Sequence, residues 1–316
     1  MTLKMTPALW AMLLLTATLF GSSFFFIKLT VGGIPPLTLA AGRAALAAFA
    51  VYLFMRILGQ RLPELGRGWL PIIGLGVLTA VIPYVAIAWG QVHIDSSLGG
   101  ILFATIPVFS VLVAPAFLAE EQLTTDRLLG VAVGLAGVAL TIGPQALTGL
   151  GTQLLGAGVT IIAALSYATG NIYARRQSHL SPVVIATGQL VVATIVLVPI
   201  SLAADRPWQL SPSMIQLANL AIVALVNTAA PVLLMFWLVR KAGASNTSLL
   251  AFFMPAVSVL LGVLILGEEF AWLAALGFAL IILGAALVTG NFAVRNRQIP
   301  VGMTSRSRSR ISTRHC

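Results

Sequence analysis

The chain has 316 residues, of which 59% are hydrophobic and only 8% charged, and its formal net charge is +10. Ordinary soluble proteins carry about 25% charged residues, so this composition excludes a soluble globular protein. Because Lys and Arg stand between apolar runs, where they suit anionic lipid headgroups, a nucleic-acid-binding role is excluded as well. We therefore predict an all-α polytopic membrane protein.

Ten apolar stretches are each long enough to cross a bilayer as a helix, which takes about 20 residues. The first is interpreted as a span rather than a cleaved signal sequence, because it is long and nine more spans follow. The ten predicted transmembrane helices are 8–28, 36–57, 69–90, 97–118, 127–143, 152–173, 182–201, 213–238, 245–266 and 269–290.

The same pattern of residues occurs twice in the chain, beginning in spans four and nine. It consists of a proline in the span, a glutamate pair at its end and two glycines in the next span: Pro107, Glu120-Glu121, Gly130 and Gly137, then Pro255, Glu268-Glu269, Gly277 and Gly284. This indicates a duplication into five-helix repeats at 1–143 and 152–290, followed by a disordered basic cytoplasmic tail at 291–316. Five is odd, so the second repeat must be inverted in the membrane.

The distribution of Lys and Arg predicts the orientation of the chain. Nearly all of these cations fall in connections on one side, whereas the other side has only Lys28 and Arg206. Cytoplasmic loops carry the excess of Lys and Arg. Both termini are therefore expected in the cytoplasm, with the chain multi-pass in the inner (plasma) membrane.

Four prolines lie near the middle of predicted spans, Pro83 and Pro107 in the first half and Pro231 and Pro255 at matching places in the second. Each removes a backbone hydrogen bond, and in a membrane the freed carbonyl needs a partner in protein or water. A kink that only improves packing is the alternative for any one of them. As a group they favour helix breaks or hinges around a central cavity.

Polar and aromatic side chains at similar depth are candidates for contact with a bound solute. A polar group that faces lipid is costly, so these side chains should face the bundle interior, with interhelical hydrogen bonding as the alternative role. Tyr84 is the strongest candidate, because it combines a ring and a hydroxyl beside a proline. The predicted substrate-binding residues are Thr18, Phe20, Ser22, Arg43, Tyr84, Phe103, Tyr167, Gln189, Asn227 and Phe252.

Arg43 is the one cation inside a predicted span, and Gln189 holds the equivalent place in the second repeat. Its side chain could extend to the outer surface, or it could pair with a carboxylate of the solute. No Asp or Glu falls in the middle of any predicted span. That argues against permanent cations as cargo and for neutral, zwitterionic or amphipathic solutes.

The glutamate pairs have a structural interpretation. Gly267 can end one helix, which would leave Glu268 and Glu269 near the positive N-terminal end of the following helix.

No catalytic motif such as HExxH, GxSxG or a phosphate-binding glycine loop followed by Lys occurs in the chain. We therefore expect no enzyme, no catalytic residues, no cofactor and no metal. The expected partners are a small-molecule solute and the lipid bilayer, with no nucleic acid. Gly130 and Gly134 form a GxxxG motif that permits close helix contact, either within the bundle or between copies, so a monomer or weak homodimer is expected.

The chain resembles the drug/metabolite transporter superfamily, specifically its ten-helix EamA-type exporters. The resemblance is carried by Phe20-Gly21-Ser22-Ser23-Phe24-Phe25-Phe26-Ile27-Lys28, by Pro35-Pro36 with Arg43, and by the two copies of the pattern from Pro107 and Pro255. It implies two inverted repeats around a central cavity, formed largely by spans one to four and six to nine.

The resemblance also implies a secondary exporter that works by alternating access. Its best-known ten-helix members export amino acids and related metabolites, aromatic amino acids included. Two alternatives remain: an exporter of drugs or other metabolites with the same fold, and a non-transporting membrane protein or channel.

Overall fold

The computed structural model describes residues 5–64, 66–118, 124–142, 151–177, 180–247, 249–269 and 271–288, and these residues form helices and short connections without a strand. Glu120-Glu121, most of the connection 144–151 and the tail 291–316 lie outside the described residues. The first half contains α1 (Pro7–Val31), α2 (Pro36–Ile57), α3 (Trp69–Gly76), η1 (Val77–Val81), α4 (Ile82–His93), α5 (Ser96–Phe103), α6 (Ile106–Phe117) and α7 (Thr125–Ile142). The second contains α9 (Thr152–Arg175), α10 (Pro182–Ala204), η2 (Pro207–Gln209), α11 (Met214–Ala221), η3 (Ile222–Ala229), α12 (Ala230–Ala242), α13 (Ala244–Thr247), α14 (Leu250–Leu266) and α15 (Trp272–Val288).

Eight of the helical segments are long and apolar enough to cross a membrane, when continuous pieces such as Trp69–His93 are counted together. The shorter apolar helices α14 and α15, with 17 residues each, complete the set of ten. At 1.5 Å per residue a helix of that length is still near the lower limit for a span. The predicted fold, ten transmembrane helices in two inverted repeats, is confirmed.

Prolines and glycines set several helix boundaries. Pro7, Pro36 and Pro182 occupy the first turn of α1, α2 and α10, where a missing N–H costs nothing. Gly267 ends α14 with a φ of 67°, a left-handed conformation that glycine adopts without strain. The predicted end of a helix at Gly267 is therefore confirmed.

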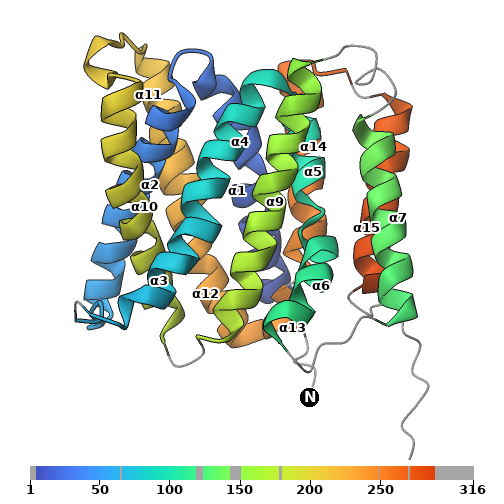
Figure 1. Ribbon diagram of the computed structural model, residues 1–316, viewed down its shortest axis with the longest axis horizontal. Coiled ribbons are helices and arrows are strands. Elements are labelled where there is room, and N and C mark those ends of the chain that lie inside the picture. The colour runs from blue at the N-terminus through green and yellow to red at the C-terminus, as the bar shows by residue number, and fades with distance from the viewer. Residues whose placement is uncertain are drawn as a thin grey trace, which may run out of the picture.

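The packing of the helices is reciprocal between the two halves. α2 packs on its counterpart α10, α7 on α15, and α5 on α14. α1 packs on η3, α12 and α14, and its counterpart α9 packs in the same way on η1, α4 and α6. Figure 1 shows α2 and α10 at one edge, α7 and α15 at the other, and α1 and α9 in the middle. Helices of each half therefore pack against the corresponding helices of the other half.

The pair α7 and α15 is joined through glycines. A Cβ built on Gly284 would lie 2.6 Å from both the Gly130 carbonyl oxygen and the Gly134 nitrogen, and one on Gly137 would lie 2.6 Å from the Gly277 carbonyl oxygen. Small residues let helix backbones approach this closely, which is how helices associate in lipid. The GxxxG motif predicted from Gly130 and Gly134 thus serves contact within the bundle.

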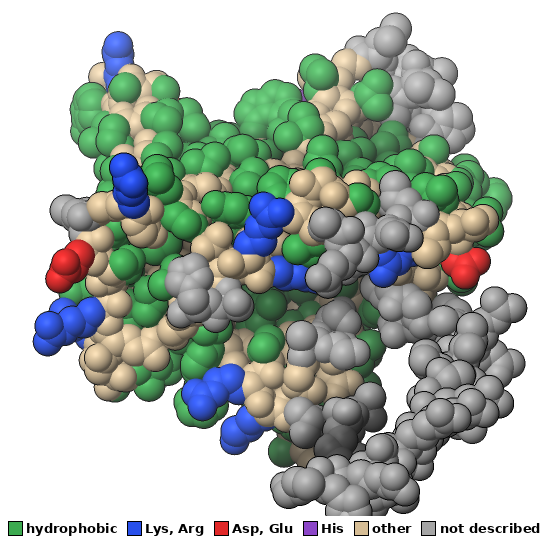
Figure 2. All heavy atoms as spheres, turned by 60° about the horizontal axis from the view of Figure 1, so that its bottom comes forward, with side chains coloured by type: hydrophobic (Ala, Val, Ile, Leu, Met, Phe, Trp, Pro, Cys, Tyr) green, Lys and Arg blue, Asp and Glu red, His purple; other side chains and the backbone are tan. Residues whose placement is uncertain are grey.

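The cations gather on the face of the bundle where α1 begins, here called the N-terminal face. Arg56, Arg175, Arg240 and Lys241 lie in the last turns of helices that end there. Figure 2 shows Lys and Arg side chains spread over this face with few acidic ones. Lys28 lies at the other end of α1, on the face we call the opposite face. That the N-terminal face is cytoplasmic stays a prediction.

We expect Gly284→Ala to destabilise the protein, because its new methyl group would meet the backbone of α7. Overpacking of this kind typically costs about 1–3 kcal/mol, so the detergent-solubilised variant should melt several degrees lower. Gly158→Ala is the matched control, since a Cβ there meets nothing within 4 Å. Equal melting temperatures of the two variants would contradict the proposed tight contact.

Candidate functional site

Two of the four central prolines follow a stretch of π-helix. η1 precedes Pro83, and η3 precedes Pro231 at the matching place of the second half. A proline ring clashes with the carbonyl four residues earlier, and a wider π turn accommodates that carbonyl. In η3 the hydroxyl of Thr228 donates to the Val223 carbonyl at 2.7 Å. The helix distortion therefore fixes the orientation of this hydroxyl.

The other two prolines behave differently from each other. Pro107 stands in the first turn of α6, directly after the break at Ala104-Thr105 that separates α5 from α6. Pro255 lies inside α14, which continues through it, and the interruption in this span falls earlier, between α13 and α14. The prediction of a break at Pro255 itself is therefore corrected: the helix ends one to two turns before the proline.

A cavity of about 220 Å³ lies between the two halves. It is smaller than the roughly 300–1,000 Å³ of pockets that take drug-sized ligands. Its walls come from α1, α2, α4, α5, α6, α9, α12, α13 and α14, with Thr228 from η3. Aromatic, polar and sulfur-containing side chains in this wall include Phe20, Ser23, Phe24, Arg43, Tyr84, Phe103, Tyr167, Thr228 and Met254.

Arg43 is buried in this wall, with 7% of its surface exposed. Its Cζ lies 4.0 Å from the centre of the Tyr84 ring, and its Nε donates to the Thr228 hydroxyl at 2.8 Å. No ion pair to Arg43 occurs among the described residues. A guanidinium has five N–H donors, and Nε uses only one of them for Thr228, so the terminal nitrogens have donors that can also bind a group entering the cavity. The side chain therefore does not extend to the surface, and pairing with a carboxylate of the solute stays a prediction.

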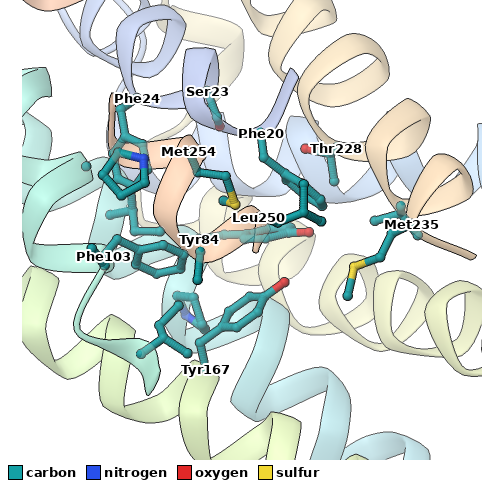
Figure 3. A pocket seen from close by; sticks show the side chains of 18 of the residues that line it. Phe20, Ser23, Phe24, Tyr84, Phe103, Tyr167, Thr228, Met235, Leu250 and Met254 are labelled. Carbon is teal, nitrogen blue, oxygen red and sulfur yellow. The ribbon is translucent and has the colours of Figure 1, made fainter. Parts of the chain in front are cut away.

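The rest of the wall is aromatic on one side and polar on the other. The Phe103 ring meets Phe24 and Tyr167 edge to face, with centroids 5.6 and 5.5 Å apart. Figure 3 shows Phe24 and Phe103 on one side, and the hydroxyls of Tyr84 and Tyr167 pointing into the space on the other. Such a cavity suits a solute with an apolar body and a polar end.

Half of the predicted substrate-binding residues reach this cavity. Phe20, Arg43, Tyr84, Phe103 and Tyr167 line it, together with Pro83 and Pro255. The remaining five predicted residues do not line the cavity; they are Thr18, Ser22, Gln189, Asn227 and Phe252. Pro107 and Pro231 do not line it either.

The polar residues outside the wall have local explanations. Thr18 is exposed and donates to the Leu14 carbonyl, whereas Ser22 accepts from Asn227 at 2.7 Å inside the bundle. Gln189 and Phe252 are half-buried away from the cavity. For Ser22 and Asn227 the alternative role, hydrogen bonding between helices, is the one the structure gives.

The sequence reasoning missed Ser23, Thr228 and Met254. A helix face recurs at three- and four-residue spacing. Starting from Phe20, that spacing leads to Ser23, Phe24 and Ile27, all of which line the cavity. The pair Thr18 and Ser22 follows the same rule from a different starting point, so periodicity alone could not choose between the faces.

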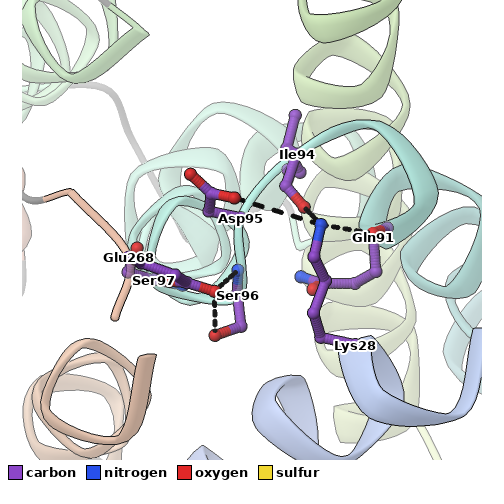
Figure 4. A network of polar contacts seen from close by, with 7 residues as sticks. All are labelled: Lys28, Gln91, Ile94, Asp95, Ser96, Ser97 and Glu268. Atoms are coloured by element: carbon purple, nitrogen blue, oxygen red, sulfur yellow. Dashed lines mark hydrogen bonds and ion pairs between the residues drawn. The ribbon is translucent and has the colours of Figure 1, made fainter. Parts of the chain in front are cut away.

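A polar network closes the bundle between the cavity and the opposite face (Figure 4). The Glu268 carboxylate accepts from the Ser96 N–H and hydroxyl, both at 2.7 Å, and from the Ser97 N–H at 2.9 Å. It thus caps the N-terminus of α5, in the first half, rather than that of the helix that follows it. This corrects the predicted place of Glu268.

Lys28 ties α1 to the same region. Its Nζ donates to the Ile94 carbonyl at 2.7 Å and to the Gln91 carbonyl at 3.0 Å, and it lies 4.0 Å from Asp95. Burial raises the pKa of Asp95, and the nearby Glu268 charge raises it further. Burial alone would raise the pKa of Glu268 too, but the hydrogen bonds from Ser97 and Ser96 outweigh it and lower the pKa.

A ten-helix bundle of two inverted halves around a central cavity has the architecture of a membrane transporter. Residues 7–143 and 154–290 each match the EamA-like transporter family. The chain therefore belongs to the EamA-like transporter family.

Several named proteins are similar over most of the chain. The uncharacterized inner membrane transporter YedA of Escherichia coli is 27% identical over 275 residues, which are 86% of this chain and 87% of that protein. The probable terminal-alkyne amino-acid exporter of Streptantibioticus cattleyicolor is 28% identical over 299 residues, covering 94% and 98%. The probable amino-acid metabolite efflux pump of Escherichia coli is 26% identical over 282 residues, covering 86% and 91%.

A solved crystal structure shares the fold, with a TM-score of 0.63 at 20% identity, over 88% of this chain and 95% of that one.

We expect Glu268→Gln to lower the melting temperature at neutral pH, because it weakens charge-assisted hydrogen bonds between the halves. Given the partial exposure of Glu268, the loss should be about 1–2 kcal/mol. A carboxylate whose pKa is lowered by folding stabilises the fold above its ordinary pKa of 4.5. The gap between wild type and variant should therefore shrink as the pH falls below 4.5.

The control for this measurement is Glu269→Gln, at the exposed neighbouring position. A gap that stays constant from pH 7 to strongly acidic pH would show that the charge of Glu268 does not contribute.

Proposed function

We propose that this chain is a secondary exporter of small amphipathic metabolites that carry a carboxylate, foremost amino acids with aromatic or hydrophobic side chains. Transport proceeds by alternating access through the central cavity. No chemical conversion of the solute takes place.

The observation that carries this proposal is the buried charge of Arg43, which has no counter-charge among the residues that the structure describes. A buried charge is expensive unless it is paired, and inside a membrane protein such a residue is a functional site by default. Arg43 stacks on Tyr84 and uses Nε for Thr228, and these two contacts hold the plane of the guanidinium. A planar guanidinium held in this way matches the two oxygens of a carboxylate.

The remaining wall supports an amphipathic cargo. Phe20, Phe24 and Phe103 offer an apolar surface for a side chain, and the tyrosine hydroxyls offer hydrogen bonds. Among the described residues, no Asp or Glu lines the cavity. A permanently cationic drug would lack a counter-charge there and would meet the positive charge of Arg43.

The described conformer supports alternating access from the N-terminal face. The lining residues Asn171, Thr247 and Leu250 lie near helix ends on that face. At the opposite side the cavity stops at Ile27, the residue before Lys28, and at Gly100, about one helical turn from Ser96. If both termini are cytoplasmic, as the charge distribution predicts, this conformer loads solute from the cytoplasm.

The names of relatives point in the same direction. Two of the similar proteins are named a probable terminal-alkyne amino-acid exporter and a probable amino-acid metabolite efflux pump. At 26–28% identity these names support amino acids and their metabolites as the class of cargo, without indicating which compound is transported.

Counterflow in proteoliposomes tests the proposed function. Vesicles loaded with an unlabelled L-amino acid should accumulate the same labelled amino acid transiently, and the flux should saturate. Flux without exchange stimulation would favour a channel. Saturable flux of apolar drugs, with none of the twenty amino acids, would favour the drug-exporter alternative.

We expect Arg43→Gln to weaken binding of the amino acid that wild type transports by about tenfold or more, because hydrogen bonds to charged groups contribute about 1.5–3 kcal/mol. Arg43→Lys should recover only part of this loss, since an ammonium is a point charge without the planar fork. Thermal-shift titration measures both affinities. Equal affinity of wild type and Arg43→Gln would contradict the proposal that Arg43 binds a carboxylate.

We expect Tyr84→Ala to reduce counterflow more than it reduces stability, because it removes both the ring beneath Arg43 and a hydroxyl in the cavity. Tyr84→Phe keeps the ring and should retain most of the flux. The cation–π contact is worth about 2 kcal/mol when desolvated. Unchanged flux in a correctly inserted Tyr84→Ala protein would contradict this role.

A further inference from the structure

Among the described residues of the first half, two almost fully buried side chains have polar atoms without a hydrogen-bond partner, besides Oε1 of the half-buried Gln60. They are Ser23, through its hydroxyl, and Gln91, through both amide atoms. Gln91 is only 1% exposed and Ser23 6%. Leaving such groups unpaired destabilises the fold, so their presence in a membrane bundle calls for a reason.

The neighbourhood of Ser23 explains why it is unpaired. A helical serine usually donates to the carbonyl four residues earlier, which for Ser23 is that of Leu19. That carbonyl already accepts from Asn227 at 2.7 Å and from Ser22 at 3.2 Å. Adjacent serines on α1 therefore differ: Ser22 is joined to the second half through Asn227, and Ser23 is left over beside the cavity.

Gln91 continues the cavity face of α4 toward the opposite face. Tyr84 and Ile87 line the cavity, and Gln91 follows them at seven and four residues, which is the same side of the helix. Its Nε2 lies 2.1 Å from where a Cβ on Gly99 would stand, so the amide occupies the space that this glycine leaves on α5. The next glycine, Gly100, lines the cavity.

These positions form a path. It starts at Ser23 and Gly100 on the cavity wall, passes Gln91 and Gly99, and ends under the network of Lys28, Ser96 and Glu268 that closes the bundle (Figure 4). In this conformer the Gln91 amide fills the space beside Gly99 and the Ser258 side chain fills the space beside Gly100, so the path is closed. The unpaired groups of Ser23 and Gln91 give it polar contacts.

We propose that Ser23 and Gln91 line the route by which the solute leaves toward the opposite face. In the described conformer the route is shut and both groups are unpaired. When Glu268 releases α5, the route opens and the two side chains hydrogen-bond to water and to the polar end of the solute. The route rests on the exporter function proposed above, but it can be tested without knowing the cargo.

The test measures the accessibility of single cysteines. Cys316 is the one cysteine of the chain, so Cys316→Ser provides a cysteine-free background. Ser23→Cys and Gln91→Cys are placed in this background, each with intact Glu268 and with Glu268→Gln. A membrane-impermeant methanethiosulfonate reagent is then applied to sealed membrane vesicles of either orientation.

Glu269→Cys, exposed on the opposite face, identifies which vesicles present that face. In those vesicles, labelling of positions 23 and 91 should be slow with intact Glu268. Glu268→Gln should accelerate it about tenfold, since weakening the closed state by ~1.4 kcal/mol shifts a two-state equilibrium tenfold.

The matched controls are buried neighbours that face elsewhere. Ser22→Cys replaces the partnered serine of α1, and Ala88→Cys replaces a fully buried alanine of α4 that packs in an apolar cluster. Neither should be labelled faster in the Glu268→Gln background. Equal rates at positions 23, 91, 22 and 88 would overturn the route, even if amino acid export itself is demonstrated.

Transport gives a second, independent readout. If the unpaired groups were only structural defects, Ser23→Ala and Gln91→Leu would raise stability and leave counterflow unchanged. The route instead predicts a lower maximal flux in both variants, with melting temperatures equal to or above that of wild type. Unchanged flux together with control-level labelling would refute it.

Discussion

The bilayer offers no water to buried polar groups, so each must find its partner inside the protein. Most side-chain hydroxyls here do so within their own helix: Thr16, Thr30, Thr79, Thr160 and Thr187 each donate to the carbonyl four residues earlier. Among the described residues the exceptions are few: besides one amide oxygen each of Gln60 and Asn227, they are Arg43, Ser23 and Gln91. Arg43 lacks a counter-charge at the centre of the bundle, and Ser23 and Gln91 lack partners on the way to the opposite face. The cost of these three groups is best explained by a solute that passes them.

The fold is symmetric, but its binding chemistry is not. Arg43 comes from α2 and its counterpart in the second half is Gln189, which does not reach the cavity. The hydroxyl that orients Arg43 comes from Thr228 in η3, and the equivalent place in η1 is occupied by Ala80. Duplication therefore supplies the two-sided scaffold, and later divergence places one cation and one orienting hydroxyl across the interface. The single carboxylate site that we propose would give the solute one orientation in this symmetric bundle.

The sequence predicts the scaffold well because its signals are strong and local. Apolar runs mark the spans, the repeated pattern marks the duplication, and Pro83 and Pro231 coincide with the distorted helices that flank the cavity. Arg43 and Tyr84 are also predicted correctly as cavity residues, because a cation inside a span and a tyrosine beside a proline are local signals. The choice of Ser22 over Ser23 fails because one residue along a helix turns the side chain by about 100°. Which serine is free depends on Asn227, more than 200 positions away, and on its bond to Leu19. The place of Glu268 at α5 likewise depends on tertiary contact between the halves.

A transporter must keep its two conformations within a few kcal/mol of each other. The contacts of this chain divide accordingly. α7 and α15 are joined backbone to backbone through glycines, a contact that a shift of the helices would break at many points. The closure at the opposite face includes instead the hydrogen bonds from α5 to the half-buried Glu268 carboxylate, two hydrogen bonds from Lys28 to backbone carbonyls and one ion pair at 4.0 Å. All of them lie at the bundle end, where water can replace them. Charged contacts in such places contribute little net stability. The strong contacts therefore suit the parts that stay together, and the weak, water-replaceable ones lie where the bundle must open.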